Sequence, residues 1–157
     1  MTRVLRAAAI ASVLAVGSAC SSLDSTVPNP VPIEQTTFAS SLSVDLAAST
    51  KLASGMYYRD LVVGTGAAVN NGQTVTARYT GWLSNGAQFD SNQTTGYPFV
   101  LGTGRVIAGW DLGILGMRVG GKRQLIIPAT LGYGPNGNGP IPGNAVIVFT
   151  VEVVSAQ

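Results

Sequence analysis

Short apolar runs separated by turn-forming dipeptides fill the sequence from about residue 55 onward, a pattern typical of antiparallel strands. The clearest alternation lies over residues 75–80, where Val75, Ala77 and Tyr79 share one face and polar side chains share the other. An Asn-Gly dipeptide at positions 85 and 86 predicts a tight hairpin turn directly after this strand. Further strands are predicted over residues 57–63, 88–90, 125–127 and 145–154.

One short helix is predicted over residues 109–115, because Ile107, Trp110 and Ile114 have the three- to four-residue spacing of a helix face. The segment 145–154 carries β-branched residues on both faces, as a strand in the middle of a sheet does. We therefore expect an α+β fold, in which an antiparallel sheet curves over one short helix.

Residues 1–19 have the pattern of a bacterial lipoprotein signal peptide. Arg3 and Arg6 precede an apolar run over residues 7–16, which is too short to span a membrane as a helix. The Gly-Ser-Ala-Cys sequence that ends at Cys20 resembles a lipobox, in which the cysteine thiol is lipidated and the chain is cleaved before it.

The same segment leads to an expectation for where the protein is located. Because Ser21, and not an acidic residue, follows Cys20, we expect a lipid anchor in the outer membrane of the cell envelope, with the protein facing the periplasm. In a bacterium with a single membrane, the same anchor places the protein on the cell surface. An ordinary secretory signal followed by a free cysteine is the alternative interpretation.

Residues 20–50, rich in Ser, Thr, Ala and Pro, are predicted to form the lipidated N-terminus and a flexible linker. Apolar residues within it indicate that part of it packs on the domain or forms a short helix over residues 44–52. These apolar residues are Phe38, Leu42, Val44 and Leu46. The folded domain is predicted to span residues 51–157.

Composition excludes several kinds of function. The 157 residues include no histidine and one cysteine, which rules out Ser-His-Asp and Cys-His catalysis, a disulfide framework and cysteine-rich zinc sites. The formal net charge of +2 is too small to indicate nucleic-acid binding. Without residues 1–19 the chain loses Arg3 and Arg6 and becomes formally neutral.

Aromatic side chains come from almost every predicted element and often lie beside a glycine or a turn. They form either an ordinary core, since aromatic residues supply much of the apolar burial in a domain of this size, or the wall of a pocket on one face. The residues concerned are Tyr79, Phe89, Tyr97, Phe99, Trp110, Tyr133 and Phe149.

Six sequence blocks, spread over about residues 54–155, together form a more specific pattern. They are Tyr-Thr-Gly at 79–81, Phe-Asp-Ser at 89–91, Val-Ile-Ala-Gly-Trp-Asp at 106–111, Gly-Met-Arg-Val-Gly-Gly-Lys-Arg at 116–123, Tyr-Gly at 133–134, and Ile-Pro at 141–142 with the strand 145–152. In order and spacing these blocks resemble the FKBP-type peptidyl-prolyl cis-trans isomerases. The resemblance implies a strongly curved, five-stranded antiparallel sheet wrapped around a short helix.

The resemblance also implies a function. It indicates an enzyme that isomerises X–Pro bonds in folding, exported polypeptides by stabilising a twisted amide in an apolar aromatic pocket, with no metal or cofactor. Macrolides of the tacrolimus and rapamycin type are implied as ligands. A lipid-anchored chaperone or binding module that uses the same groove with little isomerase activity is the alternative.

The implied site is carried over residue by residue, with Trp110 as the floor on which the proline ring lies. In the family, the backbone N–H that matches Ile107 and the hydroxyl that matches Tyr133 bind carbonyls of the ligand, and the carboxylate that matches Asp90 lies at the polar edge. The catalytic set is Tyr79, Phe89, Asp90, Val106, Ile107, Trp110, Tyr133 and Phe149. Tyr97, Phe99 and Ile141 are the implied substrate-binding residues.

The sequence departs from the family pattern in three places. The segment after Asp90 is about two residues short, so either Tyr97 or Phe99 supplies the next pocket aromatic, and we prefer Tyr97. The stretch from Asp90 to Gly104 contains no arginine or lysine to pair with the aspartate. The loop over residues 134–143 is also shortened, which affects the expected substrate preference more than catalysis.

Overall fold

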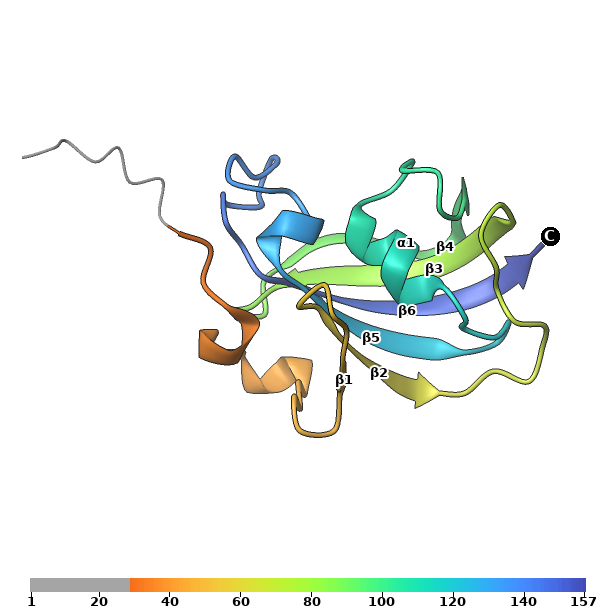
Figure 1. Cartoon of the computed structure of the whole chain (residues 1–157), viewed down its shortest axis with the longest axis horizontal. Helices are drawn as coiled ribbons and strands as arrows, with labels where there is room; N and C mark the ends of the chain where they lie inside the picture. The colour runs from red at the N-terminus through yellow and green to blue at the C-terminus, as the bar shows by residue number, and fades with distance from the viewer. Residues whose placement is uncertain (1–28) are drawn as a thin grey trace, which may run out of the picture.

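Six antiparallel strands in one sheet form the framework of the structure, a computed structural model that describes residues 29–157 (Figure 1). Their spatial order is β1-β2-β5-β6-β3-β4, and every neighbouring pair is antiparallel. The strands are β1 (Thr50–Lys51), β2 (Tyr57–Val62), β3 (Thr74–Leu83), β4 (Gln88–Val100), β5 (Lys122–Ile127) and β6 (Ile147–Ala156).

The predicted α+β class is confirmed, with an antiparallel sheet and one α-helix in the described part of the chain. The sheet has six strands, and not the five expected. The additional strand, β1, is two residues long and pairs with Tyr57 and Tyr58 at the edge of the sheet. Two residues are too few for an alternating pattern to be recognised in the sequence.

The central strands β5 and β6 are buried on both faces. Leu125, Ile127 and Phe149 belong to the core cluster on one side, whereas Ile126 and Val148 belong to a second cluster on the other side. This division follows the alternation of side chains along a strand. Each face of these two strands must therefore be covered by another segment of the chain.

Helix α1 (Ala108–Ile114), within one residue of its predicted span at each end, covers one face of the sheet. Trp110 is only 4% exposed and points into the core on this side. Glycines let the helix approach β5 closely, since a Cβ on Gly109 would lie 2.5 Å from Cγ2 of Ile127. Gly113 faces the same strand one turn later.

Residues 33–46, here called the N-terminal strap, cover the opposite face (Figure 1, orange). The strap contains two 3₁₀ turns, η1 (Ile33–Gln35) and η2 (Ser40–Leu42). Ile33 is 2% exposed and Leu42 is 8% exposed. Both pack in the second cluster, whose other buried members are Tyr57, Ile126, Val146 and Val148.

The strap corrects one boundary of the predicted linker. From Ile33 onward, residues expected within the flexible linker over 20–50 pack on the sheet, which is one of the two outcomes that their apolar side chains indicated. The other outcome, a short helix over 44–52, is not formed. The physical reason is that Ile126 and Val148 present apolar side chains on the outer face of β5 and β6, and these need a cover.

Three hydrogen bonds fix the backbone of the strap to the sheet. The buried side-chain amide of Gln124 donates to the carbonyl of Leu42 at 2.8 Å. The amide of Ala39 donates to the carbonyl of Ser84 at 2.8 Å, and Nη2 of Arg59 donates to the carbonyl of Ser43 at 2.7 Å. The strap is therefore held at three separate points along its length.

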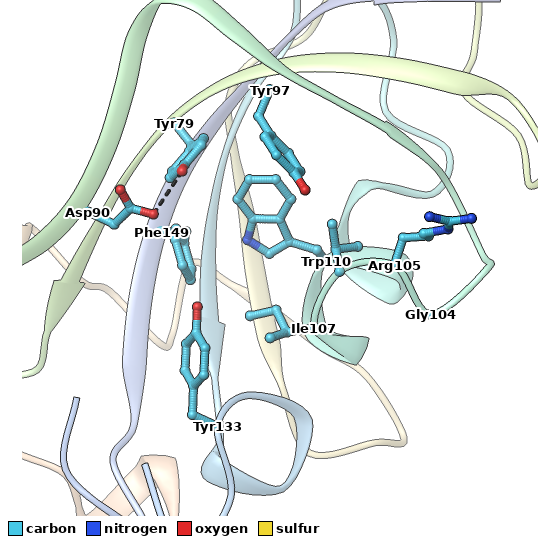
Figure 2. A pocket seen from close by; sticks show the side chains of 10 residues that line it. Tyr79, Asp90, Tyr97, Gly104, Arg105, Ile107, Trp110, Tyr133 and Phe149 are labelled. Atoms are coloured by element: carbon cyan, nitrogen blue, oxygen red, sulfur yellow. Dashed lines mark hydrogen bonds between the residues drawn. The ribbon is translucent and has the colours of Figure 1, made fainter. Parts of the chain in front are cut away.

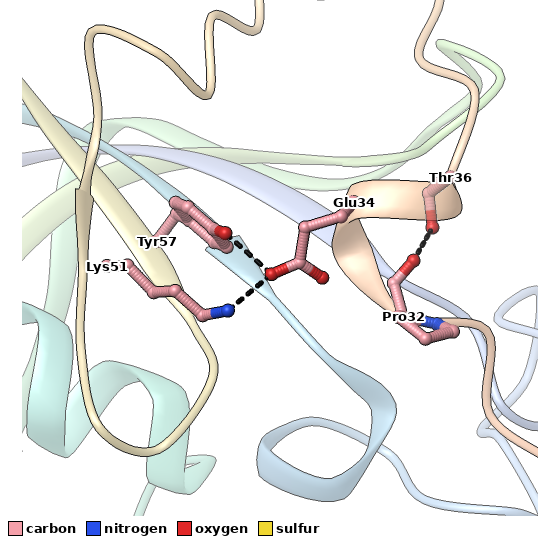
Figure 3. A network of polar contacts seen from close by, with 5 residues as sticks. All are labelled: Pro32, Glu34, Thr36, Lys51 and Tyr57. Atoms are coloured by element: carbon pink, nitrogen blue, oxygen red, sulfur yellow. Dashed lines mark hydrogen bonds and ion pairs between the residues drawn. The ribbon is translucent and has the colours of Figure 1, made fainter.

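An exposed polar network adds a fourth attachment (Figure 3). Oε1 of Glu34 accepts hydrogen bonds from the Lys51 ammonium at 2.5 Å and from the Tyr57 hydroxyl at 2.6 Å. Lys51 lies on β1 and Tyr57 on β2, so one carboxylate links the strap to both strands.

We expect the contribution of Glu34 to stability to be lost in acid. The hydrogen bond from Lys51 and then that from Tyr57 lower the pKa of Glu34 from 4.5 to about 2. The unfolded chain therefore binds this proton more readily, so the stabilisation is present above about pH 4.5 and is lost as the pH falls towards 2. The free energy of unfolding of wild type minus that of Glu34→Gln, measured with urea, should be small and positive at neutral pH and shrink to zero near pH 2. A difference that stayed constant over this range would contradict the expectation.

The residues proposed for export and lipidation, 1–19 and Cys20, lie outside the described residues. Among the helices that the structure describes, none is both long and apolar enough to cross a membrane.

Candidate active site

A cavity of about 510 Å³ opens between the sheet, the start of α1 and the loop that follows η3 (Ala129–Leu131) (Figure 2). Residues from three strands, helix α1 and two loops converge on it because the sheet wraps around the helix. The lining residues are Tyr79 on β3, Asp90 and Tyr97 on β4, Gly104, Arg105, Val106 and Ile107 before α1, Trp110 on α1, Tyr133 after η3, and Phe149 on β6.

Trp110 forms the floor of the cavity within a cluster of aromatic rings. Its indole lies 5.0 Å from the ring centre of Tyr79 and 5.4 Å from that of Phe149, and both contacts are edge-to-face. Phe99 packs against it at 5.5 Å. Each such pair contributes about 0.5–1.5 kcal/mol beyond the burial of area, so the orientation of the indole is well defined.

Tyr79 and Asp90 form the polar edge of the cavity. The Tyr79 hydroxyl donates to Oδ2 of Asp90 at 2.8 Å, and the backbone amide of Ser91 donates to Oδ1 at 2.8 Å. Burial, and secondly this hydrogen bond, raise the pKa of Tyr79 well above its ordinary value. Asp90 therefore has a hydrogen-bond donor on each of its carboxylate oxygens.

The Tyr133 hydroxyl is a hydrogen-bond donor that no described residue uses. It points into the cavity towards Phe149 (Figure 2). Burial, and secondly the charge of Asp90, raise the pKa of Tyr133, so the hydroxyl keeps its proton at neutral pH. The backbone N–H of Ile107 is likewise not used in a hydrogen bond among the described residues. Both groups are available to a ligand.

Most of the residues expected in the site do line this cavity, but three lie behind its wall. Phe89 packs edge-to-face on Tyr133 and on Phe149 at 6.4 and 5.4 Å, so it supports the lining rings from behind. Phe99 is 5% exposed and lies beneath Trp110, and Ile141 is 6% exposed in the core. Tyr97, at 43% exposure, is the β4 aromatic that lines the cavity, as we preferred from the sequence.

Gly104 and Arg105 line the cavity but were not expected from the sequence. Arg105 lies one residue beyond the stretch from Asp90 to Gly104, which contains no arginine or lysine. The sequence could have indicated them, because they directly precede Val106 and Ile107, which the family resemblance implies are pocket residues.

Comparison with known proteins agrees with this geometry. The sequence model of the family described as FKBP-type peptidyl-prolyl cis-trans isomerase matches residues 65–154. A relative from Neisseria meningitidis serogroup B, named FK506-binding protein, is 46% identical over 103 residues, which cover 64% of this chain and 94% of the relative. The crystal structure of AtFKBP13 superposes with a TM-score of 0.65 at 38% identity, covering 69% of this chain and 98% of that one.

Other relatives are much longer. FK506-binding protein 4 of Dictyostelium discoideum is 50% identical over 105 residues, which are 66% of this chain. The matched part spans only 29% of the length of that relative. The similarity therefore concerns one domain of the longer protein.

Proposed function

Because this chain belongs to the FKBP-type peptidyl-prolyl cis-trans isomerase family, we propose that it catalyses cis–trans isomerisation of X–Pro bonds in polypeptides. The observation that carries the proposal is the cavity of about 510 Å³, floored by Trp110 and walled by Tyr79 and Phe149, with unused hydrogen-bond donors at its rim. A proline ring is apolar and compact, which suits such a cavity.

The apolar walls of the cavity lower the barrier to rotation about the X–Pro bond. Turning an amide out of plane breaks its resonance and costs about 18–20 kcal/mol without catalysis. A twisted amide has less charge separation than a planar one, so an apolar cavity that excludes water stabilises it relative to the ground state. Trp110, Tyr79 and Phe149 supply this environment.

The unused donors orient the substrate. The Ile107 N–H and the Tyr133 hydroxyl hold carbonyl groups on either side of the rotating bond, so that the proline ring stays on Trp110 while the rest of the chain turns. No covalent bond is made or broken. The reaction therefore needs neither a nucleophile nor a general base, and Asp90 acts by fixing the Tyr79 ring through its hydrogen bond.

Two assays run side by side test the proposal against its alternative. A protease-coupled assay with an X–Pro peptide should show catalysis by the full chain, and a macrolide of the tacrolimus type should inhibit it by occupying the same cavity. If the protein instead suppresses aggregation of an unfolded client but does not accelerate isomerisation, it is a binding module or chaperone.

We also propose that the protein is exported and lipid-anchored at Cys20, in the outer membrane facing the periplasm, where it assists folding of exported proteins. The support is the sequence pattern: two arginines, an apolar run over residues 7–16, and small residues before Cys20, which is followed by Ser21. Two or three acyl chains on one cysteine are sufficient for stable anchoring.

Mass spectrometry of the protein from its native envelope should find a mature N-terminus at Cys20 that carries acyl chains. In a Cys20→Ser variant this modified species should disappear and the protein should leave the membrane fraction. An unmodified Cys20, or a chain that retains residues 1–19, would contradict the proposed anchor and leave the isomerase proposal unaffected.

A further inference from the structure

Arg105 lies where the active-site cavity meets a second cavity. The second cavity, of about 270 Å³, runs along β4 and is lined by Thr74, Pro98, Phe99 and Val100. Both cavities are also lined by Tyr97 and Arg105. The surface available to an extended polypeptide therefore continues past the proline pocket, with Arg105 at the junction.

The guanidinium of Arg105 has no partner among the described residues. No carboxylate of residues 29–157 lies within ion-pair distance of it, and it makes no hydrogen bond there. Every other described lysine or arginine forms an ion pair with a carboxylate or donates a hydrogen bond to a carbonyl. These are Lys51, Arg59, Arg78, Arg118, Lys122 and Arg123.

The loop that carries Arg105 is held in place without involving its side chain. The Asp111 carboxylate accepts hydrogen bonds from the backbone amides of Gly102 and Gly104 at 2.8 and 3.1 Å. The Thr103 hydroxyl donates to the carbonyl of Val100 at 2.8 Å. A fixed backbone with an unpaired cation lowers the entropic cost of binding an anion.

The two charged residues of the active-site cavity lie on opposite sides of Trp110, the floor of the cavity. Figure 2 shows Asp90 on one side of Trp110 and Arg105 on the other. Both oxygens of Asp90 already accept hydrogen bonds, whereas Arg105 has no partner among the described residues, so Arg105 is the charged group here that is free to bind a substrate side chain. An acidic residue of the substrate, on the side of the proline that passes Arg105, complements it.

We propose that Arg105 is a specificity-determining residue that selects X–Pro segments with an aspartate or glutamate within about three residues of the proline, on one side only. Its guanidinium binds the side-chain carboxylate, and the residues beyond it lie in the second cavity. This inference rests on the proposed isomerase function.

The test uses acetylated, amidated peptides with one proline, in which a glutamate is moved through the positions before and after it. Amidation leaves the side chain as the only carboxylate. The dissociation constant for the full chain, measured by calorimetry, should be about threefold lower for glutamate than for glutamine at positions on one side, the size expected of a partly exposed ion pair. High salt should reduce this ratio.

Substitution of Arg105 should remove the preference. In Arg105→Gln the ratio of the two dissociation constants should fall to about one, and in Arg105→Glu it should invert. The matched control is Arg118→Gln, since Arg118 is exposed, donates to the carbonyl of Gly66 and lines neither cavity. It should keep the wild-type ratio.

Equal binding of glutamate and glutamine peptides by the wild type, or a preference that survives in Arg105→Gln, would overturn the inference. Isomerisation of the same peptides, followed in parallel, separates this failure from that of the proposed function. Peptides that bind with the predicted preference but are not isomerised would contradict the isomerase proposal alone.

Discussion

Replacing Trp110 with leucine is expected to lower kcat/KM for an X–Pro peptide by at least about tenfold, with the protein still folded. The indole is the floor of the cavity and contacts the rings of Tyr79, Phe99 and Phe149. A tenfold loss corresponds to about 1.4 kcal/mol of transition-state stabilisation. Leucine is chosen because it leaves a smaller void than alanine at a site that is 4% exposed.

The chain contains a matched control for this substitution. Trp82, the other tryptophan, is partly buried and packs against the second cluster, on the opposite face of the sheet. Trp82→Leu should lower stability but keep kcat/KM within about twofold of wild type. It also leaves Trp110 as the only tryptophan, so its fluorescence then reports ligand binding directly. A folded Trp110→Leu variant with wild-type kcat/KM would show that the floor of the cavity is not where the reaction takes place.

Shortening Leu42 to alanine is expected to lower the free energy of unfolding by about 2–4 kcal/mol, although this residue lies outside residues 65–154, which match the family. Leu42 is 8% exposed and packs with Tyr57, Ile126 and Val148. Ile33→Ala, at a site 2% exposed, should cost a similar amount. Urea unfolding measures both changes. Because the strap and the cavity lie on opposite faces of the sheet, the folded variants should keep their kcat/KM.

Val31, two residues before the strap, provides the control. Its side chain is 49% exposed, so Val31→Ala should change the free energy of unfolding by less than about 0.5 kcal/mol. If Leu42→Ala and Ile33→Ala were equally mild, the strap would rest on the sheet without contributing to its stability. The strap would then be dispensable for folding.

The elements with strong local signals could be predicted from the sequence. The Asn-Gly turn joins β3 and β4 as expected, with Gly86 at a φ of 88°, a conformation that glycine adopts without strain. Helix α1 was recognised because Trp110 and Ile114 both face one buried surface. In each case the local pattern and the tertiary contacts favour the same structure.

The elements that depend on distant partners could not be predicted fully. β4 extends from Gln88 to Val100, yet only three of its residues were expected, because it is an edge strand whose exposed side chains show no alternation. Between Asn92 and Tyr97 it also bulges opposite Arg78. The strap was uncertain for a similar reason, since its few apolar residues show their role only against the outer face of the sheet.

The site could be predicted as far as its residues fall in recognisable blocks. Trp110 and Tyr133 were placed by the family resemblance, and both line the cavity. Phe89 belongs to a block as well, but its ring packs against Tyr133 and Phe149 and is not among the lining residues, because sequence order does not distinguish a ring that lines a cavity from one that supports it. Arg105 lies next to a block and has no pattern of its own, and only the folded structure places it between two cavities.

The most direct test of the account is exchange NMR of a short X–Pro peptide with a catalytic amount of the full chain. Without catalyst, cis and trans forms interchange over tens of seconds or longer, too slowly for exchange cross-peaks. We predict strong cis–trans cross-peaks with the wild type, abolished by a tacrolimus-type macrolide and greatly weakened in Trp110→Leu. Cross-peaks no stronger than those of the peptide alone, from a protein shown to be folded, would contradict the central claim.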